Sequence, residues 1–191
     1  QIKAYLIQKK RKKRKSKKEP LTEKWVARLD GTSQYWQLSE PINLIAGDVV
    51  ELCFAGGAVQ NAYAMFFESD SKNLYISVTA GKTEFRLKAA FGTPMLNGGE
   101  IDNNTTPVPL GGSNVISAGA VSGEALSLLG GRVGGSLIMN LPLYNFKVIR
   151  NGAVIHEIPL TNKSQGANQM PTVGTVSATM VNYTDGVWES I

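Results

Sequence analysis

"YNFKVIRNGAVIHEIPL" runs from Tyr144 to Leu160 and holds the pattern that decides the fold. Apolar and polar residues alternate on both sides of the dipeptide Asn151-Gly152, as they do in two half-buried strands. Asn-Gly is preferred in two-residue hairpin loops, because both positions of a type I′ turn require a positive φ. The sequence therefore predicts an antiparallel hairpin with Asn151 and Gly152 at its turn.

Shorter runs with similar alternation occupy the chain before this hairpin. We expect strands in residues 24–29, 35–38, 42–45, 49–54, 62–69, 73–81 and 82–91. In the first run, one face would carry Trp25, Ala27 and Leu29, and the other Lys24, Val26 and Arg28. Many short strands separated by turn residues are typical of an all-β fold, here a two-sheet antiparallel sandwich or jelly roll.

Three other segments lack this pattern. Residues 97–123 are rich in Gly, Asn, Thr and Pro, which predicts a long surface excursion. "GEALSLL", residues 123–129, could form one or two helical turns that end at a Gly-Gly pair. Residues 161–191 are rich in Gly, Asn and Thr and are interpreted as a C-terminal tail.

A block of positive charge precedes the strands. It consists of Lys9, Lys10, Arg11, Lys12, Lys13, Arg14, Lys15, Lys17 and Lys18. The chain has a net charge of +5, but residues 19–191 hold 10 basic and 15 acidic side chains, a net of −5. We therefore divide the chain into a basic N-terminal arm, residues 1–20, and a mildly acidic β domain, residues 21–191. Such an arm could bind nucleic acid or acidic protein surfaces, address the protein to a compartment, or keep it soluble.

Two residues with reactive side chains occur once each. Cys53 lies in the apolar run "VVELCF", where a buried small side chain is expected, and a lone cysteine forms no internal disulfide. His156 lies in an alternating strand, where a solvated or hydrogen-bonded ring is expected rather than a metal ligand. No zinc-binding spacing, nucleophile elbow, P-loop or dinucleotide fingerprint accompanies them.

Acidic residues give no stronger indication of catalysis. Glu51, Glu68, Asp70 and Glu84 could supply the carboxylate pair of a glycosidase, but any β protein of this size has such residues. Asn97–Asn104 is rich in oxygen ligands but lacks the EF-hand spacing, so a solvated loop is expected. We expect a protein that is not an enzyme, without a cofactor or metal. The sequence contains no run of about 20 apolar residues, so we expect no membrane span.

The segment "LPLYNFKVIRNGAVIHEIPLTNKSQG", residues 141–166, resembles a late hairpin of the laminin-G/concanavalin A-like domains of bacteriophage structural proteins. The matching positions are Tyr144, Phe146, Val148, Asn151, Gly152 and Val154. The likeness extends over residues 26–190 and is strongest over Ile158–Glu189. It implies a concanavalin A-like or laminin-G-like jelly-roll sandwich.

The resemblance also implies a place in a virion. The expected function is that of a non-enzymatic structural protein, as a capsid decoration, spike or tail component. Its arm would anchor it to neighbouring virion proteins, and its sandwich would bind host glycans; a homo-oligomer is expected. The alternative is a shell-forming capsid protein whose basic arm binds packaged nucleic acid, and such binding would weaken steeply with salt. A glycan-cleaving enzyme is a third class.

Overall fold

The computed structural model describes residues 24–72, 74–88, 92–132 and 134–191, so the arm, with its block of nine basic residues, lies outside the described ranges. The strands are β1 (Trp25–Ala27), β2 (Trp36–Leu44), β3 (Val49–Ala55), β4 (Met65–Glu68), β5 (Tyr75–Val78), β6 (Phe85–Leu87), β7 (Met95–Leu96), β8 (Gly99–Glu100), β9 (Ser113–Gly119), β10 (Glu124–Leu129), β11 (Leu143–Arg150), β12 (Ala153–Ile158), β13 (Asn168–Gln169), β14 (Ala178–Met180) and β15 (Trp188–Ser190). Two single-turn 3-10 helices, η1 (Lys163–Gln165) and η2 (Asp185–Val187), complete the elements. Over these ranges, no helix is long and apolar enough to cross a membrane.

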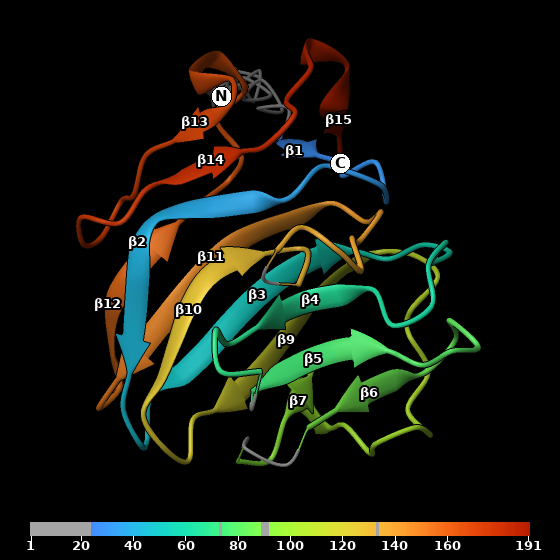
Figure 1. The fold of residues 1–191 in the computed structure, drawn as a ribbon, viewed down its shortest axis with the longest axis vertical. Coiled ribbons are helices and arrows are strands. Elements are labelled where there is room, and N and C mark those ends of the chain that lie inside the picture. The colour runs from blue at the N-terminus through green and yellow to red at the C-terminus, as the bar shows by residue number, and fades with distance from the viewer. Residues whose placement is uncertain (1–23, 73, 89–91, 133) are drawn as a thin grey trace, which may run out of the picture.

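Two antiparallel sheets pack on one another, which confirms the predicted all-β class (Figure 1). The first sheet has seven strands in the order β13-β14-β2-β10-β4-β5-β6, and the second has six in the order β12-β11-β3-β9-β7-β8. A third, two-stranded sheet joins β1 to β15 near the end of the molecule where the C-terminus lies (Figure 1). The first and last strands of the domain are therefore paired with each other.

Aromatic side chains hold the two sheets together. The ring centroids of Phe54 in β3 and Phe66 in β4 are 4.9 Å apart, and those of Phe66 and Phe85 in β6 are 5.6 Å apart. All three side chains are fully buried. Because Phe54 belongs to one sheet and its partners to the other, this cluster lies between the layers, where burial of large apolar surface stabilises the fold.

The predicted hairpin is formed by β11 and β12. Asn151 has φ 51 and Gly152 has φ 78, so both turn residues have the positive φ that a type I′ turn requires. Phe146 lies opposite Ile158 in this ladder, and both side chains are fully buried. Their neighbour Lys147 lies on the other face of the sheet and is half-buried. The register shifts by one residue between Val148 and Ile149, so a β-bulge separates the turn from the buried Phe146–Ile158 pair.

The prediction of a surface excursion over residues 97–123 is wrong for its second half. β9 lies between β3 and β7 in the six-stranded sheet, and its residues Ile116 and Ala118 are buried. Composition favoured a loop because Ser, Asn and Gly disfavour strands. Hydrogen bonds along both edges and burial of alternate side chains override that local preference.

The suggested helix over residues 123–129 is also wrong, because this segment is β10. It pairs with β2, with Leu126 opposite Ile42, and with β4, with Leu129 opposite Phe67. Leu126 and Leu129 are both fully buried. A segment of this length gains little as an isolated helix, whereas here it gains a ladder of hydrogen bonds with β2 and a further pairing with β4 at Leu129.

Three further expectations about strands change. Residues 35–38 and 42–45 were predicted as separate runs, but Trp36–Leu44 is one strand that continues through Pro41. It can do so because β14 pairs only with the first part of β2, which leaves Pro41 on an open edge. Val26 and Ala27 are both fully buried, so β1 has no solvated face. Residues 161–191 are no tail, because β14 and β15 extend two sheets.

Candidate functional site

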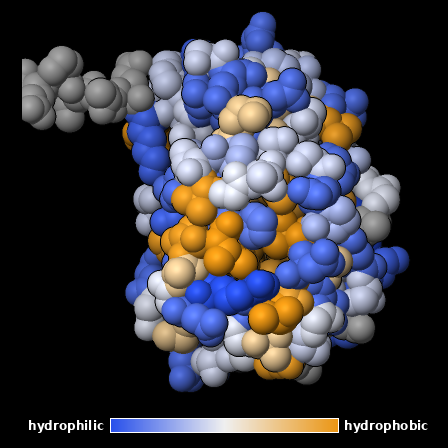
Figure 2. All heavy atoms as spheres, turned by 90° about the vertical axis from the view of Figure 1, so that its left-hand side faces the viewer, coloured by the Kyte–Doolittle hydropathy of each residue, from blue (hydrophilic) through white to orange (hydrophobic). Residues whose placement is uncertain are grey.

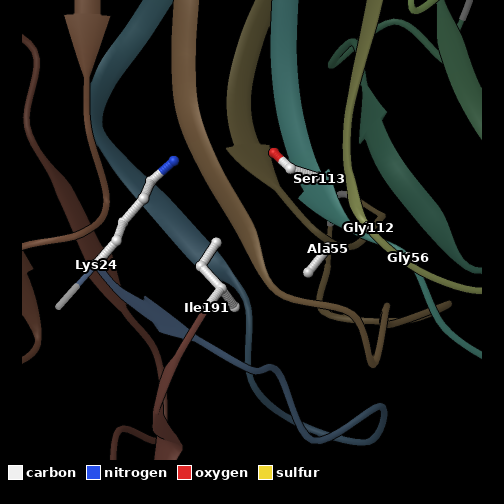
Figure 3. Close-up of a pocket in the computed structure, with 6 residues that line it drawn as sticks. All are labelled: Lys24, Ala55, Gly56, Gly112, Ser113 and Ile191. Carbon is white, nitrogen blue, oxygen red and sulfur yellow. The ribbon is translucent and has the colours of Figure 1, made fainter. Parts of the chain in front are cut away.

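A groove opens between the terminal strand pair, β1 and β15, and the end of the six-stranded sheet (Figure 3). Its volume is about 410 Å³ and its walls are mainly apolar. It is lined by Lys24, Ala55, Gly56, Gly112, Ser113 and Ile191, and we call it the terminal groove.

Strand pairing on each side sets the shape of the terminal groove. On one side, Ile191 donates its backbone N–H to the carbonyl of Lys24 at 3.0 Å, so the two ends of the β domain lie side by side. On the other side, Ala55 lies opposite Ser113 at the end of the β3–β9 ladder. Figure 3 shows Lys24 and Ile191 on one wall and Ser113 and Ala55 on the other.

Two glycines allow the floor of the terminal groove to form. The N–H of Gly56 donates to the carbonyl of Gly112 at 2.8 Å. A Cβ at position 56 would lie 2.5 Å from the carbonyl oxygen of Gly111, so no larger residue fits there without moving the backbone. Gly112 itself has φ 73, which side chains rarely adopt. The close approach of the two segments keeps this end of the groove free of side chains.

Tyr144 supports the groove from below. Its ring is fully buried, its hydroxyl is hydrogen-bonded to the Ser113 hydroxyl, and the Lys24 ammonium lies 4.3 Å from the ring centroid. Burial raises the pKa of Tyr144, and the hydrogen bond with Ser113 only partly opposes that effect. Tyr144 therefore stays a neutral phenol that positions Ser113 and Lys24.

Cys53 lies opposite Tyr144 in the sheet and is 8% exposed. Burial raises the pKa of its thiol, and the Asn145 side chain opposes this effect in part. The expected role of a buried small side chain is confirmed, since a protonated, buried thiol is a poor nucleophile.

His156 differs from its expected environment. Its Nδ1 atom is buried and has no hydrogen-bond partner in the described parts of the chain, so the expectation of a solvated or hydrogen-bonded ring is wrong at this atom. Gly174 packs against the ring, where a Cβ would lie 2.8 Å from Nδ1. Burial and the positive charge of Arg150 lower the pKa of His156, which favours a neutral ring.

The four candidate carboxylates contact different partners. Glu68 is bound by Arg132 at 2.9 Å, and Glu51 lies 3.9 Å from the Lys147 ammonium. Asp70 accepts a hydrogen bond from Ser127 at 2.5 Å, and Glu84 accepts one from Thr79 at 3.0 Å. Across the described residues, no group of three or more His, Cys, Asp or Glu side chains could hold a metal ion.

A second surface feature lies on the side of the molecule that carries the predicted hairpin. Figure 2 shows apolar side chains gathered at the middle of this face, which is the left-hand side of Figure 1, where β2 and β12 lie. Val154 of β12 is 37% exposed, and Ile45, which follows β2, is 50% exposed. Arg150 lies beside this region and binds the buried Asp48. Asn151 and Gly152 form the turn of the β11–β12 hairpin and do not line the terminal groove.

Sequence reasoning did not find the terminal groove, because its lining comes from four separate segments and none carries a motif. No protein-family model, curated protein or solved structure matches the chain. The groove offers apolar walls, one ammonium and one hydroxyl, and it lacks a nucleophile paired with a base. This chemistry suits the binding of an apolar segment from a partner.

Proposed function

We propose that this protein is a non-enzymatic structural component of a virion, as a capsid decoration, spike or tail protein. In this proposal the two sheets form a concanavalin A-like or laminin-G-like jelly roll, and the domain also binds host glycans. The antiparallel packing of six- and seven-stranded sheets and the pairing of β1 with β15 support that fold assignment. The basic arm, residues 1–20, anchors the domain to its neighbours.

The position of the terminal groove carries the proposal. Lys24, the first described residue after the arm, lines the groove, so the arm joins the domain at an apolar binding surface. We assign the groove to Ala4–Ile7 of a neighbouring copy, the apolar "AYLI" segment that precedes the charges. The 16 residues between Ile7 and Lys24 can span about 50 Å when extended, far enough to reach another copy. The net charge of −5 on residues 19–191 attracts a basic arm.

The test compares the mass of the full chain with that of the chain lacking residues 1–20, by sedimentation after nuclease treatment. We expect oligomers from the full chain and monomers from the truncated chain. The melting temperature should change by only a few degrees, because surface changes usually alter stability by about 0.5 kcal/mol or less.

A groove variant locates the contact. Ile191→Asp places a charge in the terminal groove and should also give monomers. Leu110→Asp is the matched control, because Leu110 is 79% exposed and does not line this groove. A full chain that stays monomeric would contradict the proposal. Assembly that requires nucleic acid and is lost at high salt would instead support the packaging alternative.

A further inference from the structure

A second concavity, of about 460 Å³, lies where β5 turns into β6, at the right-hand side of Figure 1. Its lining includes Tyr63, Thr79, Gly81, Glu84, Arg86 and Asn104, and we call it the Tyr63–Arg86 concavity. Unlike the terminal groove, it brings an aromatic ring together with a cation, a carboxylate, an amide and a hydroxyl.

Arg86 differs from the other arginines in the described ranges. Arg28, Arg132 and Arg150 each bind a carboxylate, at 2.8, 2.9 and 2.7 Å. Arg86 has no acidic side chain within ion-pair distance in these ranges, and its guanidinium lies 4.8 Å from the centroid of the Tyr63 ring. Stacking on an aromatic face leaves the edge of the guanidinium free to bind a planar anion through two hydrogen bonds.

The backbone holds Tyr63 in an unusual conformation. Its φ is 57, a value that is uncommon for a bulky residue, and the residue is 37% exposed. Asn61 anchors the loop through a 3.0 Å hydrogen bond from Nδ2 to the carbonyl of Ile138. Conformations of this kind persist only where the surroundings enforce them, and they are frequent at ligand-binding sites. The loop therefore presents an aromatic ring at the rim.

Polar groups with unused hydrogen-bonding capacity complete the lining. The Oε2 atom of Glu84 accepts a 3.0 Å hydrogen bond from the Thr79 hydroxyl, which leaves Oε1 able to accept another. The backbone N–H of Asn104 donates to the carbonyl of Phe85 at 2.9 Å, and this fixes the position of the residue. The Asn104 amide makes no hydrogen bond to any residue in the described part of the chain. Glu84 and Asn104 can therefore bind hydroxyl groups.

We propose that the Tyr63–Arg86 concavity binds an acidic sugar, one that carries a single carboxylate and several hydroxyls. Arg86 binds the carboxylate, and Glu84 and Asn104 bind hydroxyls. The part of the Tyr63 ring that Arg86 does not cover packs against the apolar face of the sugar ring. A phosphate is disfavoured, because Glu84 would repel its higher charge. The inference rests on the proposed glycan binding and names its site and ligand class.

The test titrates the full chain with sialyllactose and, separately, with lactose as the neutral counterpart. We expect binding of sialyllactose and at least tenfold weaker binding of lactose. Arg86→Gln and Tyr63→Ala should each weaken sialyllactose binding by about tenfold or more, the loss expected for a bidentate or stacking contact. Arg86→Lys should recover only part of the affinity, because an ammonium lacks the planar fork.

Lys82→Gln is the matched control. It removes a positive charge from the same turn but not from the lining, so it should leave affinity within about twofold. Thermal unfolding of each variant shows whether it is folded. Equal binding of both sugars, or unchanged binding by Arg86→Gln, would overturn the proposal. So would binding of an acidic peptide without binding of sialyllactose. These variants leave the arm and terminal groove intact, so sugar binding and assembly can fail independently.

Discussion

Asp48 and Glu68 are both buried carboxylates held by an arginine, yet they depend on that arginine to different degrees. Their side chains are 1% and 0% exposed, and those of Arg150 and Arg132 are 35% and 33% exposed. Arg150 binds Asp48 through two parallel hydrogen bonds of 2.8 and 2.7 Å. Arg132 Nε lies 3.0 and 3.1 Å from the two oxygens of Glu68.

The two carboxylates differ in whether a group other than the arginine binds them. Asp48 also accepts the backbone N–H of Ile45 at 2.9 Å, within the turn that connects β2 to β3. Glu68 accepts hydrogen bonds only from Arg132 in the described ranges. A carboxylate that also caps a turn keeps part of its stabilisation without its arginine, whereas one that depends on a single side chain does not. This comparison teaches that equal burial and equal pairing do not imply equal dependence.

Arg132→Met should have the largest effect on the free energy of unfolding. It leaves the buried Glu68 without its partner, which should cost about 3 kcal/mol, at the low end of the usual range because the guanidinium is partly solvated. Urea unfolding at neutral pH measures the change. The double variant Glu68→Leu with Arg132→Met removes both charges and should recover most of the loss. A single-variant loss below about 1 kcal/mol would contradict the comparison.

Arg150→Met should cost less, about 2 kcal/mol, because the Ile45 N–H still binds Asp48. The same urea titration, performed beside that of Arg132→Met, measures the difference. If Arg150→Met proves the more destabilising variant, the backbone hydrogen bond contributes less than we infer.

Gly152→Val should destabilise the domain by about 1–2 kcal/mol, because a β-branched residue is strained at a positive φ. This variant also tests the contact between Arg150 and Asp48, because Arg150 immediately precedes the turn. Combined with Arg150→Met, it should cost less than the two single variants together, because a displaced turn already weakens the contact with Asp48. Asn151→Gly is the control and should be nearly neutral. Strict additivity would show that the turn does not position Arg150.

The smallest effect is expected from mild acid. The pKa of Asp48 lies below its usual 3.8, chiefly because of the hydrogen bonds from Arg150, which outweigh burial; the Ile45 N–H adds to this effect. The unfolded chain therefore binds more protons as the pH falls past 3.8. The contribution to stability is complete above about pH 5 and is lost as the pH drops through the folded-state pKa. Urea unfolding between about pH 3 and 6 should show a shallower acid loss for Asp48→Asn than for the natural chain. An equal loss of stability with falling pH in the two proteins would contradict a lowered pKa for Asp48.

Part of the fold could be predicted from local patterns. The Asn151-Gly152 turn follows from the φ that each residue tolerates, and the buried Cys53 follows from its apolar neighbours. β9 and β10 could not be predicted in the same way. Their residues have weak or helical local preferences, and they become strands because β2 and β3, distant in sequence, supply both hydrogen bonds and burial.

Neither concavity could be predicted from the spacing of residues along the sequence. The terminal groove joins Lys24 to Ser113 and Ile191, and the second site joins Tyr63 to Arg86 and Asn104. Each residue type is common on protein surfaces, so no single stretch indicates a site. Only the absence of an acidic partner for Arg86 distinguishes it from the other described arginines, and that absence is a property of the tertiary structure.

The sequence by itself determined the all-β class, the hairpin turn and the uneven distribution of charge, with a block of basic residues followed by a net charge of −5 over residues 19–191. These properties depend on residues close together in the chain, through backbone preference, alternation and summed charge. The tertiary structure alone decided which carboxylate meets which arginine, because Glu68 and Arg132 are 64 residues apart and Asp48 and Arg150 are 102 apart. Sheet pairing brings such distant residues together, and their contact energies depend on that geometry rather than on any local pattern.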